Sequence, residues 1–280
     1  MHVRDFAGGA LALQAVHDGA AHVCSGAYEH TLLQQSQGHD FRAFVVQGRA
    51  PQQALGVSVR ALPGYRRPAD LRGRRVGVSA PGSSTQVMAS VLLARAGVDA
   101  REVSFVGVGT GATAVAALRT GRVHALCHAD PIMSLLEHRG EVRLVSDLRT
   151  LTAAQEVFGG SMPASCLYAP QAFLHKEPMV AQALTNAIVH ALKWLQTASP
   201  ADLIKAVPAS YVLGDRAVYL AAFNRVRETF SPNGLMPEDG PATALRALAQ
   251  AYPHMASPRV SLPRTFTDDL ARKARQKFGV

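Results

Sequence analysis

The chain has 280 residues, of which 48% are hydrophobic, and it carries a formal net charge of +9 at pH 7. This length and composition indicate a globular protein with enough residues for one large domain or two lobes. No apolar run approaches the ~20 residues that span a bilayer, and the first residues lack the basic region and apolar core of a signal peptide. Three cysteines are too few and too scattered for a disulfide framework or a CxxC metal site.

Most of the positive charge comes from arginine, which is densest at Arg66, Arg67, Arg72, Arg74 and Arg75. A basic surface can attract nucleic acid, anionic lipid or acidic partners. This cluster lacks interleaved aromatic residues, and no nucleic-acid-binding motif accompanies it. We therefore interpret it as a solvated basic face and expect no nucleic-acid partner.

Short strands and helices alternate along the first part of the chain. We expect strands at residues 3–6 (the end of a strand), 21–25, 41–47, 54–59, 75–79, 102–106, 124–128 and 142–146. Between them we expect helices at about 10–17, 29–37, 83–97, 112–119 and 131–138. This alternation predicts an α/β fold with largely parallel sheets.

The chain becomes helical after Tyr168, with helical patterns at residues 176–198, 201–206, 215–229 and 240–251. A polar segment at residues 61–73, which contains Pro and Gly, is a candidate lobe boundary. We therefore expect residues 1–60 to form lobe 1, with the helical part 170–280 packing on it, and residues 61–169 to form lobe 2.

Two segments of the chain match at a constant offset of 102 residues, one starting at Gly8 and the other at Thr110. They align without a gap, and Gly and His recur at turn positions. The clearest identical pairs are Gly9/Gly111, Gly19/Gly121, His22/His124 and Gly38/Gly140. We interpret the repeat as two lobes built from the same helix-strand-loop-helix unit.

In the second lobe, the strand, loop and helix of residues 75–97 precede the repeated unit. Their counterpart in the first lobe would fall before Met1. We therefore expect the first lobe to lack its first strand and helix, because the chain is truncated or its start codon was assigned too late. A sheet without that strand would expose unpaired edge groups.

The duplicated unit and three segments resemble a known family. The segments are LRGRRVGVSAPGSSTQVMASVLLARAGV, VGTGATAVAALRTGRVHALCHADP and, more loosely, CLYAPQAFLHKEPMVAQALTNAIVHALKWL. They are similar to periplasmic substrate-binding proteins of ABC importers, in the SsuA/THI5-like (NMT1-like) group that binds nitrate, sulfonates, taurine or pyrimidine precursors. The resemblance covers most of the chain to about residue 200.

This resemblance implies a type II periplasmic binding protein fold, in which two α/β lobes are joined by two crossing strands and close on a ligand in the cleft between them. It also implies a monomeric, non-enzymatic protein of the periplasm that has no cofactor. Such a protein delivers a small molecule to an ABC permease at the inner membrane.

The family resemblance also implies that three loops contact the ligand. They contribute Ser25, Gly26, Ala27, Tyr28 and Glu29 after the first-lobe strand; Gly82, Ser83, Ser84 and Thr85 at a helix start; and Asp130 after the second-lobe strand. From the residues alone, the hydroxyl groups at 83–85 either cap the helix or hold ligand oxygens. Asp130 before Pro131 is equally typical of a helix cap, and Tyr28 either stacks on a planar ligand or packs at the lobe edge.

The chemistry of these loops leaves the ligand open. A helix start with three hydroxyl groups suits a carboxylate, sulfonate or phosphate. Glu29 and Asp130 instead disfavour a bare anion and suit amine or amidine donors, as in an aminopyrimidine. The expected ligand is therefore a small polar or anionic organic molecule of the sulfonate, nitrate, carboxylate or aminopyrimidine type.

Two other functions remain as alternatives. Gly107, Gly109 and Ala112 form a GxGxxA pattern between a strand and a helix, which imitates the fingerprint of a Rossmann-type NAD(P)-binding oxidoreductase. The fold is also that of effector-sensing domains of transcription regulators, although no helix-turn-helix precedes it. We expect no metal site, because Cys127 and His128 point to opposite faces of their strand.

Overall fold

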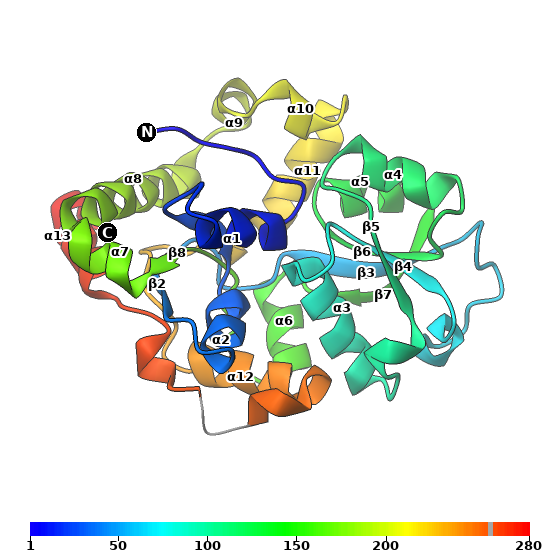
Figure 1. The fold of residues 1–280 in the computed structure, drawn as a ribbon. Helices are drawn as coiled ribbons and strands as arrows, with labels where there is room; N and C mark the ends of the chain where they lie inside the picture. The colour runs from blue at the N-terminus through cyan, green and yellow to red at the C-terminus, as the bar shows by residue number, and fades with distance from the viewer. Residues whose placement is uncertain (257–259) are drawn as a thin grey trace. The chain divides into compact units, whose positions relative to one another are not determined.

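The computed structural model describes residues 1–256 and 260–280 (Figure 1). The contacts within the chain divide it into two compact units, each assembled from three separate stretches. Unit 1 comprises Met1–Leu11, Gln52–Thr150 and Ser199–Val226, and unit 2 comprises Ala12–Pro51, Leu151–Ala198 and Arg227–Val280. The chain therefore passes from one unit to the other several times.

Unit 1 is built on a five-stranded sheet with the strand order β5-β4-β6-β3-β7. Its strands are β3 (Gln53–Ser58), β4 (Arg75–Val78), β5 (Ser104–Gly107), β6 (Ala125–Ala129) and β7 (Val142–Asp147). Strand β4 runs parallel to β5 and β6, whereas β3 runs antiparallel to β6 and β7. Every residue of β3 is buried, as expected for an inner strand of a sheet that is covered on both faces.

Helices cover both faces of this sheet (Figure 1). The helices of unit 1 are α3 (Ser84–Arg95), α4 (Ala112–Arg119), α5 (Ile132–His138), α9 (Pro200–Ala206), α10 (Ala209–Val212) and α11 (Arg216–Val226), with the short turns η1 (Pro68–Leu71) and η2 (Ala100–Glu102). Leu126 belongs to a core cluster with side chains of α4 and α5. The next residue, Cys127, contacts Ala89 of α3, because successive side chains of a strand alternate between faces.

Unit 2 is built on a three-stranded sheet with the order β1-β8-β2. Its strands are β1 (Cys24–Ala27), β2 (Phe41–Val46) and β8 (Ser165–Pro170), and β8 is antiparallel to both neighbours. Its helices are α2 (Glu29–Ser36), α6 (Leu151–Phe158), α7 (Gln171–Lys176), α8 (Pro178–Thr197), α12 (Gly240–Ala251) and α13 (Asp269–Phe278), with the turns η3 (Arg227–Thr229), η4 (Pro253–Ala256) and η5 (Leu262–Arg264). Phe44, Leu167, Val189 and Ala274 form part of its core. Helix α1 (Gly9–His17) begins among the residues of unit 1 and ends among those of unit 2.

The internal repeat is visible in the structure. Helix α1, strand β1, helix α2 and strand β2 match α4, β6, α5 and β7 in order and in spacing. In each unit the two strands of the repeat flank one antiparallel strand, which gives the orders β1-β8-β2 and β6-β3-β7. The predicted α/β fold with two lobes that share a repeat is therefore confirmed. The expectation of largely parallel sheets is wrong, because among the described strands only β4 pairs in parallel, with β5 and β6, whereas β3 and β8 are antiparallel to both of their neighbours.

Several boundaries differ from the expected ones. The strand at Gln53–Ser58, assigned to lobe 1, pairs with β6 and β7 of unit 1. Residues Ser199–Val226, expected to pack on lobe 1, belong to unit 1, where α11 contacts α5. Residues 151–169, assigned to lobe 2, belong to unit 2, and residues 3–6 form no strand. A strand that is buried along its whole length, such as β3, suits either sheet equally, so the sequence pattern could not assign it.

Candidate functional site

The predicted helix start at Gly82–Thr85 uses its hydroxyl groups within the fold. Ser84 Oγ accepts a hydrogen bond from Gln53 Nε2 at 3.0 Å, and Thr85 Oγ1 accepts one from the backbone N of Ser79 at 2.9 Å. The backbone N of Gly82 donates to Gln86 Oε1 at 2.8 Å. Thr85 is buried, whereas Gly82 is exposed and Ser84 is half-buried. Of these three residues, Gly82 and Ser84 remain partly accessible to a ligand.

Ser83 caps a different helix from the one it precedes. Its Oγ accepts a hydrogen bond from the backbone N of Ala10, in the first turn of α1, at 2.9 Å, and its side chain makes no capping bond to α3. Gly8 packs on the same loop, since a Cβ at this position would lie 2.7 Å from both Ala80 Cβ and Ser83 Oγ. The backbone of Gly8 therefore covers the buried Ser83 side chain.

The segment Ser25–Glu29 contributes more to the core of unit 2 than to its surface. Tyr28 is fully buried, and its hydroxyl group lies 2.6 Å from Thr265 Oγ1; burial raises the pKa of this phenol well above its usual value. Glu29 and Ala27 are also buried. Only Ser25, whose Oγ donates to Gln47 Oε1 at 3.2 Å, is exposed, and its neighbour Gly26 is half-buried. Of its two interpretations, the structure supports packing for Tyr28.

Asp130 belongs to a buried ion cluster in unit 1. Its Oδ1 accepts hydrogen bonds from the backbone N of Ser134 at 2.8 Å and from Arg149 Nη1 at 3.2 Å. The first bond supports the helix-capping interpretation. Its Oδ2 is buried and has no hydrogen-bond partner among the described residues. The sequence argument did not include Arg149, which lies 19 residues further along the chain.

Arg149 is the centre of this cluster and is completely buried. Its guanidinium group also contacts the carboxylates of Asp147 at 2.8 Å and Glu137 at 2.9 Å, and Glu137 accepts a further bond from Arg225 at 2.7 Å. Burial alone would raise the pKa values of Asp147 and Glu137, but the bonds from the arginines outweigh it and lower both. The charge of Asp130 is therefore compensated within unit 1.

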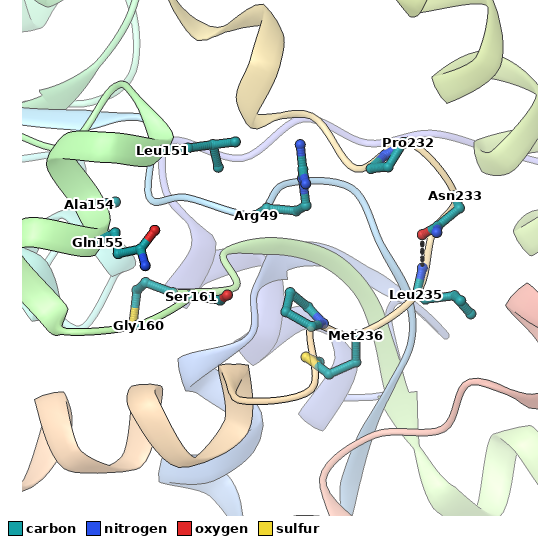
Figure 2. A pocket seen from close by; sticks show the side chains of 12 residues that line it. Arg49, Leu151, Ala154, Gln155, Gly160, Ser161, Pro232, Asn233, Leu235 and Met236 are labelled. Carbon is teal, nitrogen blue, oxygen red and sulfur yellow. Dashed lines mark hydrogen bonds between the residues drawn. The ribbon is translucent and has the colours of Figure 1, made fainter.

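A pocket of about 400 Å³ lies within unit 2 (Figure 2). Arg49 lies three residues after the end of β2, and residues Gly160 to Met162 lie just before β8. Because β8 is antiparallel to β1 and β2, the carboxyl ends of β1 and β2 lie at the same end of the sheet as the start of β8. This is the end of an open α/β sheet where ligands gather. The pocket wall consists of Arg49, Leu151, Ala154, Gln155, Gly160, Ser161, Met162, Pro232, Asn233, Leu235, Met236 and Pro237.

Arg49 supplies the positive charge of this pocket. Its backbone is fixed by a bond from its N to Thr229 O at 2.7 Å, and its side chain lies between Leu151 and Pro232 (Figure 2). One guanidinium nitrogen, Nη2, donates to Glu228 O at 2.8 Å, while the buried Nε has no partner among the described residues. None of the pocket residues is acidic. The nearby Asp239 carboxylate accepts a bond from the backbone N of Ser161 at 2.9 Å.

Sequence reasoning missed Arg49 because no pattern marks it. It follows a predicted strand as one arginine among many, and the repeat pairs it with Leu151, an apolar residue. A second pocket, in unit 1, is lined by residues of α4, α5 and α10 and includes Arg119. That arginine is already neutralised by a bidentate pair with Glu141, at 2.7 Å for each bond.

The GxGxxA pattern does not form a dinucleotide site in this sheet. It follows β5, whose only neighbour in the sheet as described is β4. A Rossmann site needs the acidic residue at the end of the next strand alongside, but Asp130 follows β6, which lies beyond β4, and it is bound to Arg149. Within the described part of the chain, no cluster of three or more His, Cys, Asp or Glu side chains could hold a metal ion.

Two α/β sheets that share a repeat, each with one antiparallel strand inserted between repeat strands, define the periplasmic binding protein fold. The family model described as NMT1/THI5 like matches residues 4–201. The chain therefore belongs to the NMT1/THI5-like family, as its sequence predicts. The comparison with curated proteins gave no match.

Solved structures show the same fold. A protein from Bordetella bronchiseptica RB50 is 52% identical, with a TM-score of 0.96 over 99% of this chain and 87% of that chain. The alkanesulfonate-binding protein SsuA from Xanthomonas axonopodis pv. citri, bound to MOPS, is 20% identical, with a TM-score of 0.66 over 95% of this chain and 86% of that chain. The desulfurization enzyme DszB is 17% identical, with a TM-score of 0.56 over 91% and 85%. The last two show the fold alone.

Proposed function

We propose that this protein is the solute-binding component of an ABC-type importer and that its ligand is a small organic anion held by Arg49. The observation that carries the proposal is the half-buried guanidinium group in the wall of the unit 2 pocket, which has no carboxylate partner among the described residues. A buried charge without an opposite charge is costly, and an anionic ligand would remove that cost.

The pocket's composition supports this ligand class. A guanidinium group binds carboxylate and sulfonate oxygens through paired N–H bonds. Leu151, Met162 and Met236 provide an apolar wall for the body of the ligand, and a volume of about 400 Å³ lies in the range of small-molecule sites. The relative SsuA was solved with MOPS, which is a sulfonate with an organic body.

We further propose a non-enzymatic role, because no cysteine of the chain has the character of a nucleophile. Cys24, Cys127 and Cys166 are all buried. Burial raises the pKa of the Cys127 thiol to about 12 and also raises the pKa values of the other two. Reactive cysteines have lowered pKa values and are partly exposed.

The partners follow from the family. We propose an ABC permease as the receptor and the periplasm as the location, with the protein acting as a monomer without a cofactor. Among the described residues, no helix is both long and apolar enough to cross a membrane. The loop residues at 25–29, 82–85 and 130 stay a proposal for further ligand contacts. Those with accessible surface are Ser25, Gly26, Gly82, Ser84 and Asp130.

A ligand panel tests the proposal. Binding of MOPS, butanesulfonate, benzoate, nitrate and 4-aminopyrimidine would be measured by thermal shift and calorimetry, with benzamide as the uncharged partner of benzoate. We expect at least one organic anion to bind and benzamide not to bind. Arg49→Gln should lower the affinity for the anion by about tenfold or more.

Arg42→Gln is the matched control, because Arg42 lies on β2 of the same unit and its bonds go to the backbone of residues 263 and 264, outside the pocket. It should leave the affinity within about twofold. Equal affinity of the wild type and Arg49→Gln for the anion, or tighter binding of 4-aminopyrimidine than of any anion, would contradict the proposal.

A further inference from the structure

One end of unit 1 carries a concentration of arginines that the proposed ligand site does not use. It is the end where β4, β5, β6 and β7 begin and where the antiparallel β3 finishes. We call it the basic end and define it by Arg60, Arg66, Arg67, Arg72, Arg74, Arg75, Arg101, Arg122 and Arg143, all of them exposed. We propose that the basic end binds the surface of a membrane that contains anionic phospholipid.

The topology explains why these arginines meet. Arg74 and Arg75 stand at the start of β4, Arg122 precedes β6 by two residues, and Arg60 follows the end of β3. Neighbouring strands are about 4.8 Å apart, so the five strand ends spread these charges over about 20 Å. The charges therefore form a broad array and not a single point.

The carboxylates at this end do not neutralise the array. Glu102 pairs with Arg72 at 3.0 Å and Asp99 with Arg101 at 2.6 Å. Asp70 accepts bonds from the backbone N of Arg66 and of Arg67, at 2.7 and 3.0 Å. Both bonds go to Oδ2, and they lower the pKa of Asp70.

Three guanidinium groups of the basic end, those of Arg66, Arg67 and Arg74, make no ion pair or hydrogen bond among the described residues. The charges of Arg67 and Arg66 still act on the Asp70 carboxyl group and help to lower its pKa. The guanidinium groups of Arg75 and Arg143 donate to backbone carbonyl oxygens. These oxygens carry no net charge, so the positive charge of both groups is not neutralised. The effect also reaches the half-buried His124, whose pKa is lowered by its burial and by Arg75 and Arg74.

A lipid surface fits this array better than nucleic acid or an acidic protein does. Base stacking needs exposed aromatic side chains, and the aromatic residue within this segment, Tyr65, is buried. A protein interface is usually anchored by packed aromatic residues at its centre. Arginines without a bonded carboxylate, at the same end of the sheet as the exposed apolar side chain of Val59, which directly follows β3, instead suit mobile lipid phosphates above an apolar layer.

The test measures sedimentation of the whole chain with vesicles. One set contains phosphatidylcholine with about 30 mol% phosphatidylglycerol, and the other contains phosphatidylcholine alone, both at low salt of about 50 mM. We expect binding to the anionic vesicles only, and we expect it to weaken steeply as salt rises, because screening shortens the reach of the charges.

The variant Arg66→Gln/Arg67→Gln/Arg74→Gln should bind anionic vesicles about a hundredfold more weakly, at about fivefold for each arginine. The control Lys176→Gln/Lys273→Gln/Lys277→Gln removes the same charge from exposed positions of unit 2 and should bind like the wild type. Equal loss in both variants would show an effect of net charge alone and overturn the proposal. Equal binding to both vesicle types, or binding to polyglutamate but not to anionic vesicles, would overturn it too.

Discussion

Replacing Arg149 with methionine should destabilise unit 1 strongly. The Arg149 side chain has no exposed surface, and it contacts three carboxylates: Asp130 at 3.2 Å, Glu137 at 2.9 Å and Asp147 at 2.8 Å. Methionine fills similar space but provides no charge and no N–H donors. The carboxylates would keep bonds from the backbone N of Ser134 and of residue 149, but Arg225, bound to Glu137 at 2.7 Å, would be the one cation left in the cluster among the described residues.

The expected loss follows from the burial of the cation. Removing one partner from a buried ion pair costs about 3–5 kcal/mol, because the other charge stays buried without compensation. The side chain of Asp130 is only 7% exposed, whereas Asp147 and Glu137 are 32% and 34% exposed. Water can therefore partly solvate two of the three acids, which places the expected loss near the lower limit, at about 3 kcal/mol.

Urea unfolding followed by far-UV circular dichroism measures this loss. The single tryptophan, Trp194, lies in α8 of unit 2, so fluorescence would not report on unit 1. Arg101→Met is the control in the same unit, because Arg101 is 91% exposed and solvent screens its pair with Asp99, which should therefore contribute little to stability. A loss for Arg149→Met no larger than that of Arg101→Met would refute the argument.

Three further predictions test other parts of the fold. The pKa values of Glu137 and Asp147 are lowered in the folded protein, so the unfolded chain binds protons more readily. Stability should therefore be full above pH ~5 and should fall as the pH drops toward the lowered pKa values. Urea midpoints measured against pH should show this fall in the wild type and much less of it in Arg149→Met. Thr85→Val removes the acceptor of the Ser79 N–H and should cost about 1–3 kcal/mol in urea unfolding, and an unchanged midpoint would count against a structural role. Gly26→Ala should lower the melting temperature, since its Cβ would lie 3.0 Å from the Tyr168 ring, whereas Gly64→Ala, with open space around it, should not.

The repeat and the strand-helix alternation predicted the fold because both are local properties. The offset between Gly9 and Gly111 identified two similar units, and it holds for helices and strands alike. Helix α12 occupies the predicted residues 240–251. Apolar periodicity specifies an element, but it does not specify which sheet a wholly buried strand such as β3 will join.

The site residues were harder to predict because their partners are distant in sequence. Ser83 stands where a residue would cap α3, yet its bond goes to Ala10, 73 residues away. Tyr28 lies in a loop that the resemblance led us to expect at the ligand, but its hydroxyl group meets Thr265, 237 residues away. Sequence spacing indicates only which nearby groups such a side chain could bond to. The outcome depends on which distant group is packed against it.

The same reasoning decides the charge that we propose for the ligand. From the sequence, Glu29 and Asp130 disfavour a bare anion, because acids at a binding site repel it. In the structure Glu29 is buried in the core of unit 2, and the charge of Asp130 is compensated by Arg149. Neither acid opposes an anionic ligand in the unit 2 pocket. The arginine that lines this pocket, Arg49, has no carboxylate partner among the described residues, so the balance of charge favours an acid and not an aminopyrimidine.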